Sequence, residues 1–358
     1  MTTNIEALKP KRPYPVNADI ELTGVNRRIK PQSVVEAIIH GENVMIKDFY
    51  STGLGILAEL KKYLKKKFNE LDFQEQRNLR SAYHNSSQRL LLLVKANKLA
   101  VRKAPTIGWL KILYPDISDF LLSFPDVQGL NSSWQWFEKG IKMPFLNQLL
   151  HPYYGTYFPT RFEHINLFVK WMKSYKGPKR TAFDIGTGCG IISFILLQEG
   201  FEKVYATDIN KNAILGVNEE IKRMKLFDKL ILGCGDLLEP LNQLTELIVF
   251  NPPWLPASFD IEGLDKAIYY DEELFPRFFK QAHPKLKANG KVVMLFSNLA
   301  QSAGVSDIHP VEEELLSGKR FKKDTLIRKK VGEASKKTKR NQNWRKNELV
   351  ELWVLSAV

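Results

Sequence analysis

The segment Thr181–Gly200, TAFDIGTGCGIISFILLQEG, restricts the possible folds more than any other stretch of the chain. An apolar run ends near Asp184, three alternating glycines follow, and a second apolar run begins at Ile191. Glycines allow a tight turn and a close approach of the backbone to a ligand, and a helix that starts there offers unpaired N–H groups. We predict a strand, a nucleotide-binding turn and a helix. The glycine spacing also fits a dinucleotide site, so the turn alone does not identify the ligand.

Short apolar segments alternate with helical patterns on both sides of this turn. The expected strands are TAFDIG, KVYATDI, KLILGCGD, ELIVFNPP and KVVMLFSN, with helices such as NAILGVNEEIKRMKL between them. Near the end of the chain, DTLIRKKVGEA and ELVELWVLSA are predicted to form a last pair of strands. This alternation predicts an α/β fold with helices on both faces of one sheet.

Three regions of the chain differ in composition and pattern. Residues 1–32 are polar with scattered prolines, and we predict a flexible arm. Residues 33–150 are predicted to form a smaller, mainly helical domain, because apolar residues recur at spacings of three and four from Leu57 to Leu71. The same helical interpretation is extended to SQRLLLLVKANKLAVRK, residues 87–103. Residues 151–358 are predicted to form the α/β domain.

Composition and charge narrow the class of protein and its partners. Hydrophobic residues make up 44% and charged residues 26% of the 358 residues, as in soluble globular proteins, and no stretch of eighteen apolar residues occurs. We therefore expect a cytoplasmic protein without a membrane segment. Cys189 and Cys234 are expected to be packing residues, and no histidine has metal-ligand spacing, so no metal is expected.

The net charge of +14 is concentrated near the C-terminus. Between Lys319 and Lys346, thirteen Lys or Arg residues stand against Asp324 and Glu333. We predict a basic insert at about residues 328–346 between the last two strands, including Trp344. It is either a contact surface for a polyanion or a solvated basic loop.

Polar residues end each of the next three predicted strands. Asp208 lies eighteen residues after Gly190, where a carboxylate can accept hydrogen bonds from a ribose diol. Asp236 ends the following strand and can accept from an adenine amino group. The fourth strand ends in IVFNPPW, residues 248–254, and this last motif distinguishes the site from a dinucleotide site.

In these motifs the chain resembles the class I S-adenosylmethionine (SAM) dependent methyltransferases, within the group that methylates amino nitrogens and carries [NDS]PP[YFW]. It is similar to release-factor glutamine methyltransferases and to RNA adenine-N6 methyltransferases over about residues 154–298. The resemblance implies a seven-stranded, doubly wound, Rossmann-like sheet with an antiparallel last strand, and SAM as cofactor. The cofactor contacts expected from it are Asp184, Gly186, Thr187, Gly188, Gly190, Asp208, Ile209, Asp236, Leu237 and Asn251. Phe158–Arg161 are expected to line the same pocket or to form a surface loop.

The NPPW motif is predicted to hold the methyl acceptor. The Asn251 side-chain carbonyl and the Pro252 backbone carbonyl can accept both N–H bonds of a planar amine and direct its lone pair at a methyl group. Pro252 and Pro253 stiffen the turn because their φ angles are fixed, and Trp254 offers a flat face for stacking. Trp254 stands where glutamine methyltransferases have Tyr, and FPTR replaces their IPRPET pattern, so the acceptor is left open.

Several functions remain after this step, and DNA adenine or a small molecule are also possible acceptors. The preferred one is N-methylation of an RNA base, because the basic insert combines cations with an aromatic residue. The alternative acceptor is a protein glutamine or asparagine side-chain amide. A third possibility is a non-catalytic RNA-binding protein with a methyltransferase fold.

Overall fold

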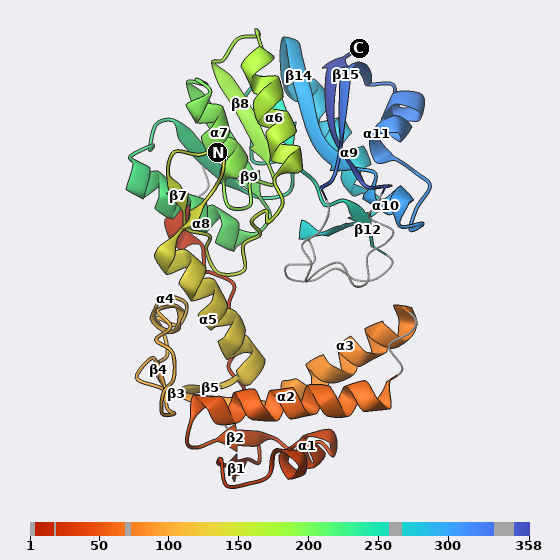
Figure 1. Cartoon of the computed structure of the whole chain (residues 1–358). Coiled ribbons are helices and arrows are strands. Elements are labelled where there is room, and N and C mark those ends of the chain that lie inside the picture. The colour runs from red at the N-terminus through yellow and green to blue at the C-terminus, as the bar shows by residue number, and fades with distance from the viewer. Residues whose placement is uncertain (1–3, 18, 69–72, 258–266, 333–346) are drawn as a thin grey trace. The chain divides into compact units, whose positions relative to one another are not determined.

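Seven strands form one sheet in the larger of the two units into which the chain divides (Figure 1). The computed structural model describes residues 4–17, 19–68, 73–257, 267–332 and 347–358. The larger unit consists of Met1–Pro10 and Lys139–Val358, and the smaller unit of Lys11–Glu138. The division therefore falls after residue 138, whereas the sequence places it after residue 150.

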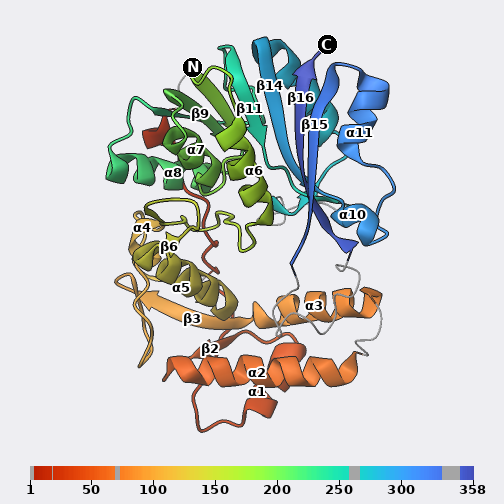
Figure 2. The same ribbon diagram turned by 45° about the horizontal axis from the view of Figure 1, so that its top comes forward.

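The order of the seven strands is β10-β9-β8-β11-β14-β16-β15 (Figure 2). Their bounds are Leu230–Cys234 for β10, Lys203–Asp208 for β9, Thr181–Ile185 for β8, Thr245–Phe250 for β11, Leu286–Ser297 for β14, Leu349–Ala357 for β16 and Phe321–Lys330 for β15. Pairing is parallel from β10 to β14, and β16 is antiparallel to both of its neighbours. The predicted seven-stranded sheet with an antiparallel last strand is confirmed.

Apolar side chains project from both faces of this sheet, and helices pack on both faces. On one face, α6 (Glu163–Ser174), α7 (Ile191–Gln198) and α8 (Lys211–Met224) pack on strand residues such as Val249 and Leu295. On the other face, α9 (Leu274–Ala282) packs Phe275, Phe278 and Phe279 on Ile248 and Met294. The alternation of neighbours such as Ile248 and Val249 follows from the two-residue period of a strand. Helices on both faces confirm the doubly wound arrangement.

Short elements complete the larger unit. They are η1 (Ile5–Ala7), β6 (Ile141–Lys142), β7 (Leu149–Leu150), β12 (Leu255–Pro256), β13 (Tyr269–Tyr270), η3 (His283–Lys285), α10 (Leu299–Ser302), α11 (Pro310–Glu313) and η4 (Glu314–Gly318). The pair β12 and β13 follows the NPPW motif directly in the chain, and β6 pairs with β7 ahead of α6.

The smaller unit combines helices with a five-stranded sheet. Its helices are α1 (Pro31–Ile39), α2 (Tyr50–Lys67), α3 (Phe73–Ser87), α4 (Trp109–Ile112) and α5 (Phe124–Lys139). Its strands are β1 (Thr23–Val25), β2 (Val44–Ile46), β3 (Leu90–Lys95), β4 (Lys98–Leu99) and β5 (Phe120–Ser123). Leu57, Leu60 and Leu64 of α2 are buried, as their helical spacing indicates. Strand β1 lies inside the segment expected to be a flexible arm.

The helical interpretation of residues 87–103 is wrong for most of that segment. Leu90–Lys95 form β3, and a two-residue turn at Ala96 and Asn97 leads into β4. Both turn residues have positive φ angles, 50° and 56°, as a tight hairpin turn requires. A short run of leucines is compatible with a buried helix or a buried strand, so its spacing could not decide between them.

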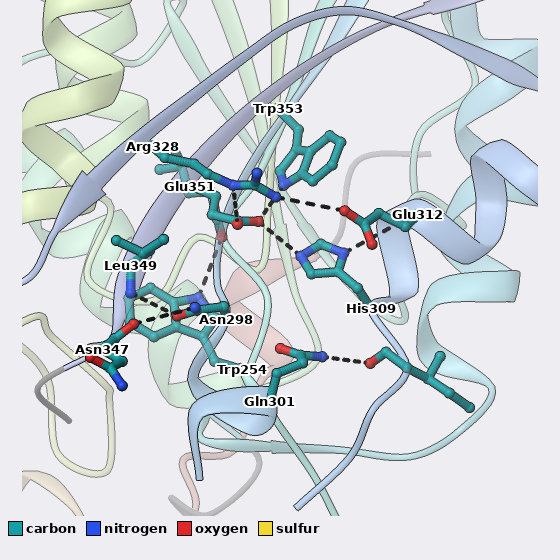
Figure 3. A network of polar contacts seen from close by, with 12 residues as sticks. Trp254, Asn298, Gln301, His309, Glu312, Arg328, Asn347, Leu349, Glu351 and Trp353 are labelled. Carbon is teal, nitrogen blue, oxygen red and sulfur yellow. Dashed lines mark hydrogen bonds and ion pairs between the residues drawn. The ribbon is translucent and has the colours of Figure 1, made fainter. Parts of the chain in front are cut away.

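A buried carboxylate joins the last two strands of the large sheet (Figure 3). Glu351 of β16 is 1% exposed and accepts hydrogen bonds from His309 Nε2 at 2.8 Å, Arg328 Nε at 2.8 Å and Trp353 Nε1 at 2.7 Å. Burial alone would raise the pKa of Glu351, but the hydrogen bonds from His309 and Arg328 outweigh it and hold this pKa below its ordinary value. The carboxylate is therefore ionised and holds β15, β16 and the segment before α11 together.

We expect Glu351→Gln to lower the free energy of unfolding by about 2–4 kcal/mol, because Arg328 would lose its buried charge partner. Chemical denaturation at neutral pH measures the loss. Since the folded pKa of Glu351 is depressed, its contribution is full above the ordinary carboxyl pKa and is lost as the pH falls through the folded value. The matched control is Glu312→Gln, whose side chain is 51% exposed and 3.6 Å from Arg328. Its expected cost is within about 0.5 kcal/mol, and equal costs for both variants would contradict this account.

Candidate active site

The turn between β8 and α7 has the backbone that its glycines predict. Gly186, Gly188 and Gly190 have φ angles of 66°, 54° and 84°, which L side chains rarely adopt. At Gly190, which caps α7, an added Cβ would also lie 2.7 Å from the ring of Phe194. The turn therefore exposes main-chain atoms where a side chain would otherwise stand.

The carboxylate of Asp184 anchors this turn from inside the sheet. Its Oδ2 accepts hydrogen bonds from Thr187 Oγ1 at 2.7 Å, from Ser193 Oγ at 2.6 Å and from the Ser193 backbone N–H at 3.0 Å. Complete burial raises the pKa of Asp184 to about 6, and these hydrogen bonds oppose the rise. Its other oxygen, Oδ1, is buried and has no partner among the described residues. One oxygen thus supports the turn, and the other remains available to a ligand.

Asp208 ends β9, the neighbour of β8, and is tied to the glycine turn. Its Oδ2 accepts from the Gly188 N–H at 2.9 Å, and its Oδ1 accepts from the Asn210 N–H at 2.8 Å. These bonds orient the carboxylate at the carboxyl end of β9. Ile209, the next residue, has an exposed side chain.

Asp236 and Leu237 follow β10, the edge strand of the sheet, and their side chains differ in burial. Asp236 is half-buried, and its Oδ2 is 3.3 Å from Arg277 Nε of α9. The Leu237 side chain is buried in the apolar layer beneath α9, and its backbone oxygen accepts from Thr207 Oγ1 at 2.6 Å. A cofactor contact at Leu237 would therefore come from the backbone.

A segment before α6 lies against the glycine turn. The Asn210 side chain donates to the Gly155 carbonyl at 2.8 Å, and the buried Asn212 side chain donates to the Tyr154 carbonyl at 2.8 Å. A Cβ on Gly188 would be 3.2 Å from the Tyr157 carbonyl. Hydrogen bonds from Asn210 and Asn212, at the start of α8, thus hold segment 153–157 against the glycine turn. Asn210 and Asn212 are not among the site residues predicted from the sequence, although an Asn before a helical pattern is a recognisable capping signal.

The NPPW motif follows β11 at the same edge of the sheet. Asn251 Oδ1 is buried and has no hydrogen-bond partner among the described residues. Trp254 Nε1 donates a long hydrogen bond of 3.4 Å to the Leu295 carbonyl of β14 (Figure 3). The Trp254 ring also meets the ring of His164, with centroids 5.0 Å apart and planes at 86°. Trp254 is therefore fixed by contacts on two elements, β14 and α6.

The topology brings most of the predicted residues to one edge. Strands β9, β8 and β11 are parallel neighbours, so Asp208, the glycine turn and Asn251 all lie at their carboxyl ends. Ligands of doubly wound folds bind at this edge.

Strands β15 and β16, which flank the basic insert, respectively end and begin at this edge as well. Strand β15 is parallel to β14 because both are antiparallel to β16, so Lys330 lies at the same edge as Asn251. Residues 333–346, which contain Trp344 and most of the insert, lie outside the described residues. Of its described cations, Arg328 is bonded to Glu351, whereas Lys329 and Lys330 are exposed.

The described part of the chain shows neither a metal-binding cluster nor a membrane-spanning helix. Within it, no group of three or more His, Cys, Asp or Glu side chains is arranged to hold a metal ion. No described helix is long and apolar enough to cross a membrane.

Residues 165–305 match the family model of the methyltransferase small domain. The chain is 39% identical over 79 residues to a release factor glutamine methyltransferase of Aquifex aeolicus, which covers 22% of this chain and 28% of the relative. It is 34% identical over 85 residues to a ribosomal protein L11 methyltransferase of Carboxydothermus hydrogenoformans, 24% of this chain and 28% of the relative. It is 30% identical over 131 residues to a Methanocaldococcus jannaschii protein whose name provisionally assigns it as a protein N5-glutamine methyltransferase, 34% of this chain and 63% of the relative.

The matched region includes the glycine turn, Asp208, Asp236 and NPPW. The expectation of a methyltransferase is therefore confirmed for this part of the chain, which matches the methyltransferase small domain. The chain spans less than two thirds of the length of each of these relatives.

We expect Asn210→Ala to loosen segment 153–157, because the substitution removes the bond to Gly155 and the helix cap that Asn210 forms with the Asn212 N–H. Losses of about 1–2 kcal/mol correspond to roughly fivefold to thirtyfold faster amide exchange in that segment. Hydrogen–deuterium exchange measures the change, and Lys211→Ala, at an exposed neighbouring position, is the control. Unchanged exchange in Asn210→Ala would show that the hydrogen bonds of Asn210 do not hold the segment.

Proposed function

We propose that this chain is a SAM-dependent N-methyltransferase that methylates an amino nitrogen of a planar group. The observation that carries the proposal is the Oδ1 of Asn251 at the carboxyl end of β11, which is buried and has no partner among the described residues. An unpaired buried acceptor costs about 1–3 kcal/mol, and a bound N–H group would remove that cost. Asn251 Oδ1 lies one strand away from a glycine turn whose backbone suits a nucleoside ligand.

The described residues fit the proposed cofactor. Asp208 places a carboxylate at the carboxyl end of β9, where nucleotide sites of this fold bind a ribose diol, and Asp184 Oδ1 is a buried acceptor without a partner among the described residues. SAM, when bound, supplies a methyl group on a positively charged sulfur. The direct contacts of Gly186, Thr187, Gly188, Gly190, Ile209 and Asp236 with it belong to the same proposal.

The work of the protein in this reaction is positioning. A planar amine is a weak nucleophile because its lone pair is delocalised into the group that carries it. Hydrogen bonds from both of its N–H groups to Asn251 Oδ1 and the Pro252 carbonyl would favour a pyramidal nitrogen. The residue before a proline is held extended, which limits the movement of Asn251. After transfer the nitrogen is positively charged and acidic, so it releases its proton without a strong base.

A protein side-chain amide is the acceptor that the relatives favour. Two of the three relatives have names that include glutamine methyltransferase. This shifts the preference from the RNA base expected from the sequence. The RNA base stays as the second candidate because Lys329 and Lys330 are exposed at the edge where Asn251 lies.

We expect Asn251→Ala to lower methyl transfer at least about a hundredfold while SAM affinity changes less than about threefold, because the substitution removes a hydrogen bond to the acceptor. Transfer of labelled methyl from SAM to cell extract and calorimetric titration with SAM measure the two quantities. The control, Asn242→Ala, removes an exposed Asn and should change neither. Retained turnover in Asn251→Ala would remove its assigned role.

A protein amide and an RNA base, as methyl acceptors, would give different labelled products. For the favoured acceptor we expect label in the protein fraction, with rates insensitive to salt. Label in RNA would support the second candidate, and replacing Lys329 and Lys330 by Gln would then reduce the salt slope of binding by about 0.7 for each phosphate that a lysine no longer neutralises. The control is Lys322 and Lys323→Gln at the opposite end of β15. Label in neither fraction, with SAM still bound, would contradict both enzymatic functions and favour a non-catalytic protein.

A further inference from the structure

A buried histidine beside the NPPW motif has no function in the reaction described so far. His164 is the second residue of α6 and is 2% exposed. Neither of its ring nitrogens has a hydrogen-bond partner among the described residues. Buried polar atoms are nearly always hydrogen-bonded, and one left unpaired destabilises the fold. Two unpaired nitrogens on one ring therefore indicate a ligand.

The position of His164 connects it to the acceptor site. Its ring lies 5.0 Å from the Trp254 ring at 86°, so it contacts the aromatic residue of NPPW directly. Ser297, the last residue of β14, has a buried hydroxyl that also lacks a partner among the described residues. Val293 and Leu295 belong to the apolar layer under α6, and strand alternation places Ser297 on the same face. His164 of α6, Asn251 after β11 and Ser297 of β14 thus each carry a buried polar atom without a partner among the described residues.

The charge state of His164 decides what it can recognise. Burial lowers its pKa to about 4, and the neighbouring charge of Glu163 opposes this only in part. The ring is therefore neutral at physiological pH and offers one N–H donor and one acceptor. Asn251, three residues before Trp254 in the chain, offers a neutral amide. Neither group compensates a positively charged alkylammonium, whereas both suit a neutral group with hydrogen-bonding atoms on adjacent positions.

We propose that His164 is a substrate-positioning residue that donates a hydrogen bond to the acceptor atom X of an H₂N–C=X group while Asn251 accepts from its amine. The inference rests on the proposed function and defines its substrate class. X is an amide oxygen or a ring nitrogen of a base, and a lysine amine, which has no X atom, is excluded. The pair fixes the plane of the group, and Trp254 covers it.

The first test compares His164→Phe with His164→Gln in labelled methyl transfer to cell extract at limiting acceptor. Phe keeps a ring against Trp254 and removes both nitrogens, so we expect kcat/KM to fall about tenfold to a hundredfold with SAM affinity unchanged. Gln restores a donor and should recover transfer to within about fivefold of the wild type. The control is His283→Phe, because His283 meets Phe321 edge to face and lies on η3 outside the site. A folded His164→Phe that keeps wild-type kcat/KM overturns the proposal and leaves the proposed function standing.

The second test needs no turnover and no variant. The ¹⁵N resonances of the histidine rings are followed while N-acetylglutamine methylamide, adenosine or N-acetyllysine methylamide is added to the full chain with S-adenosylhomocysteine present. We expect the His164 resonance to move with at least one of the first two probes and to stay unchanged with the lysine probe. Movement with the lysine probe, or with none, overturns the inference. Failure of transfer to any acceptor by the wild type would instead count against the proposed function.

Discussion

The buried carboxylate of Asp184 holds the turn on which the whole candidate site depends. Three hydrogen bonds to one of its oxygens fix Thr187 and the start of α7, and thereby the glycine backbone between them. The turn in turn supplies the Gly188 N–H that orients Asp208, and the surface against which segment 153–157 lies. A carboxylate with no counter-ion among its bonded partners is costly to bury, and the rise of its pKa to about 6 reflects that cost. The burial of the Asp184 carboxylate is tolerated because its hydroxyl and backbone donors all belong to the turn and to the start of α7.

The opposite half of the site is distinguished by polar atoms that lack partners. Asn251 Oδ1, both nitrogens of His164 and Ser297 Oγ are buried without hydrogen bonds among the described residues, whereas Glu351, on the adjacent strand β16, has three. Buried polar groups therefore differ in role at these two places. At Glu351 a satisfied network stabilises the packing of β15 on β16, and at Asn251 an unsatisfied group is available to a bound molecule. The proposed acceptor specificity follows from the neutrality of the unsatisfied groups.

The predictions from sequence succeeded where the pattern was local and long. The order of the strands' polar ends, DIGTGCG, Asp208, Asp236 and NPPW, was readable because each follows an apolar strand of ordinary length. They were incomplete in the smaller unit, where four of the five strands have only two to four residues and the six-residue β3 is a leucine-rich run without a clear period. The contact residues Asn210, Asn212 and His164 were not identified as part of the site, because each acts through a partner far away in the chain, such as Gly155 or Trp254.

The amino-acid sequence by itself determined the α/β class, the glycine turn and the residues at the strand ends, because glycine φ preferences, strand alternation and proline stiffness operate over a few residues. Tertiary structure decided which of these residues meet. Only the packing of α6 on the sheet buries His164 against Trp254, and only the antiparallel insertion of β16 turns β15 so that Lys330 ends beside the carboxyl edge. The burial of an atom and the absence of its partner depend on every element packed around it, which no local pattern encodes.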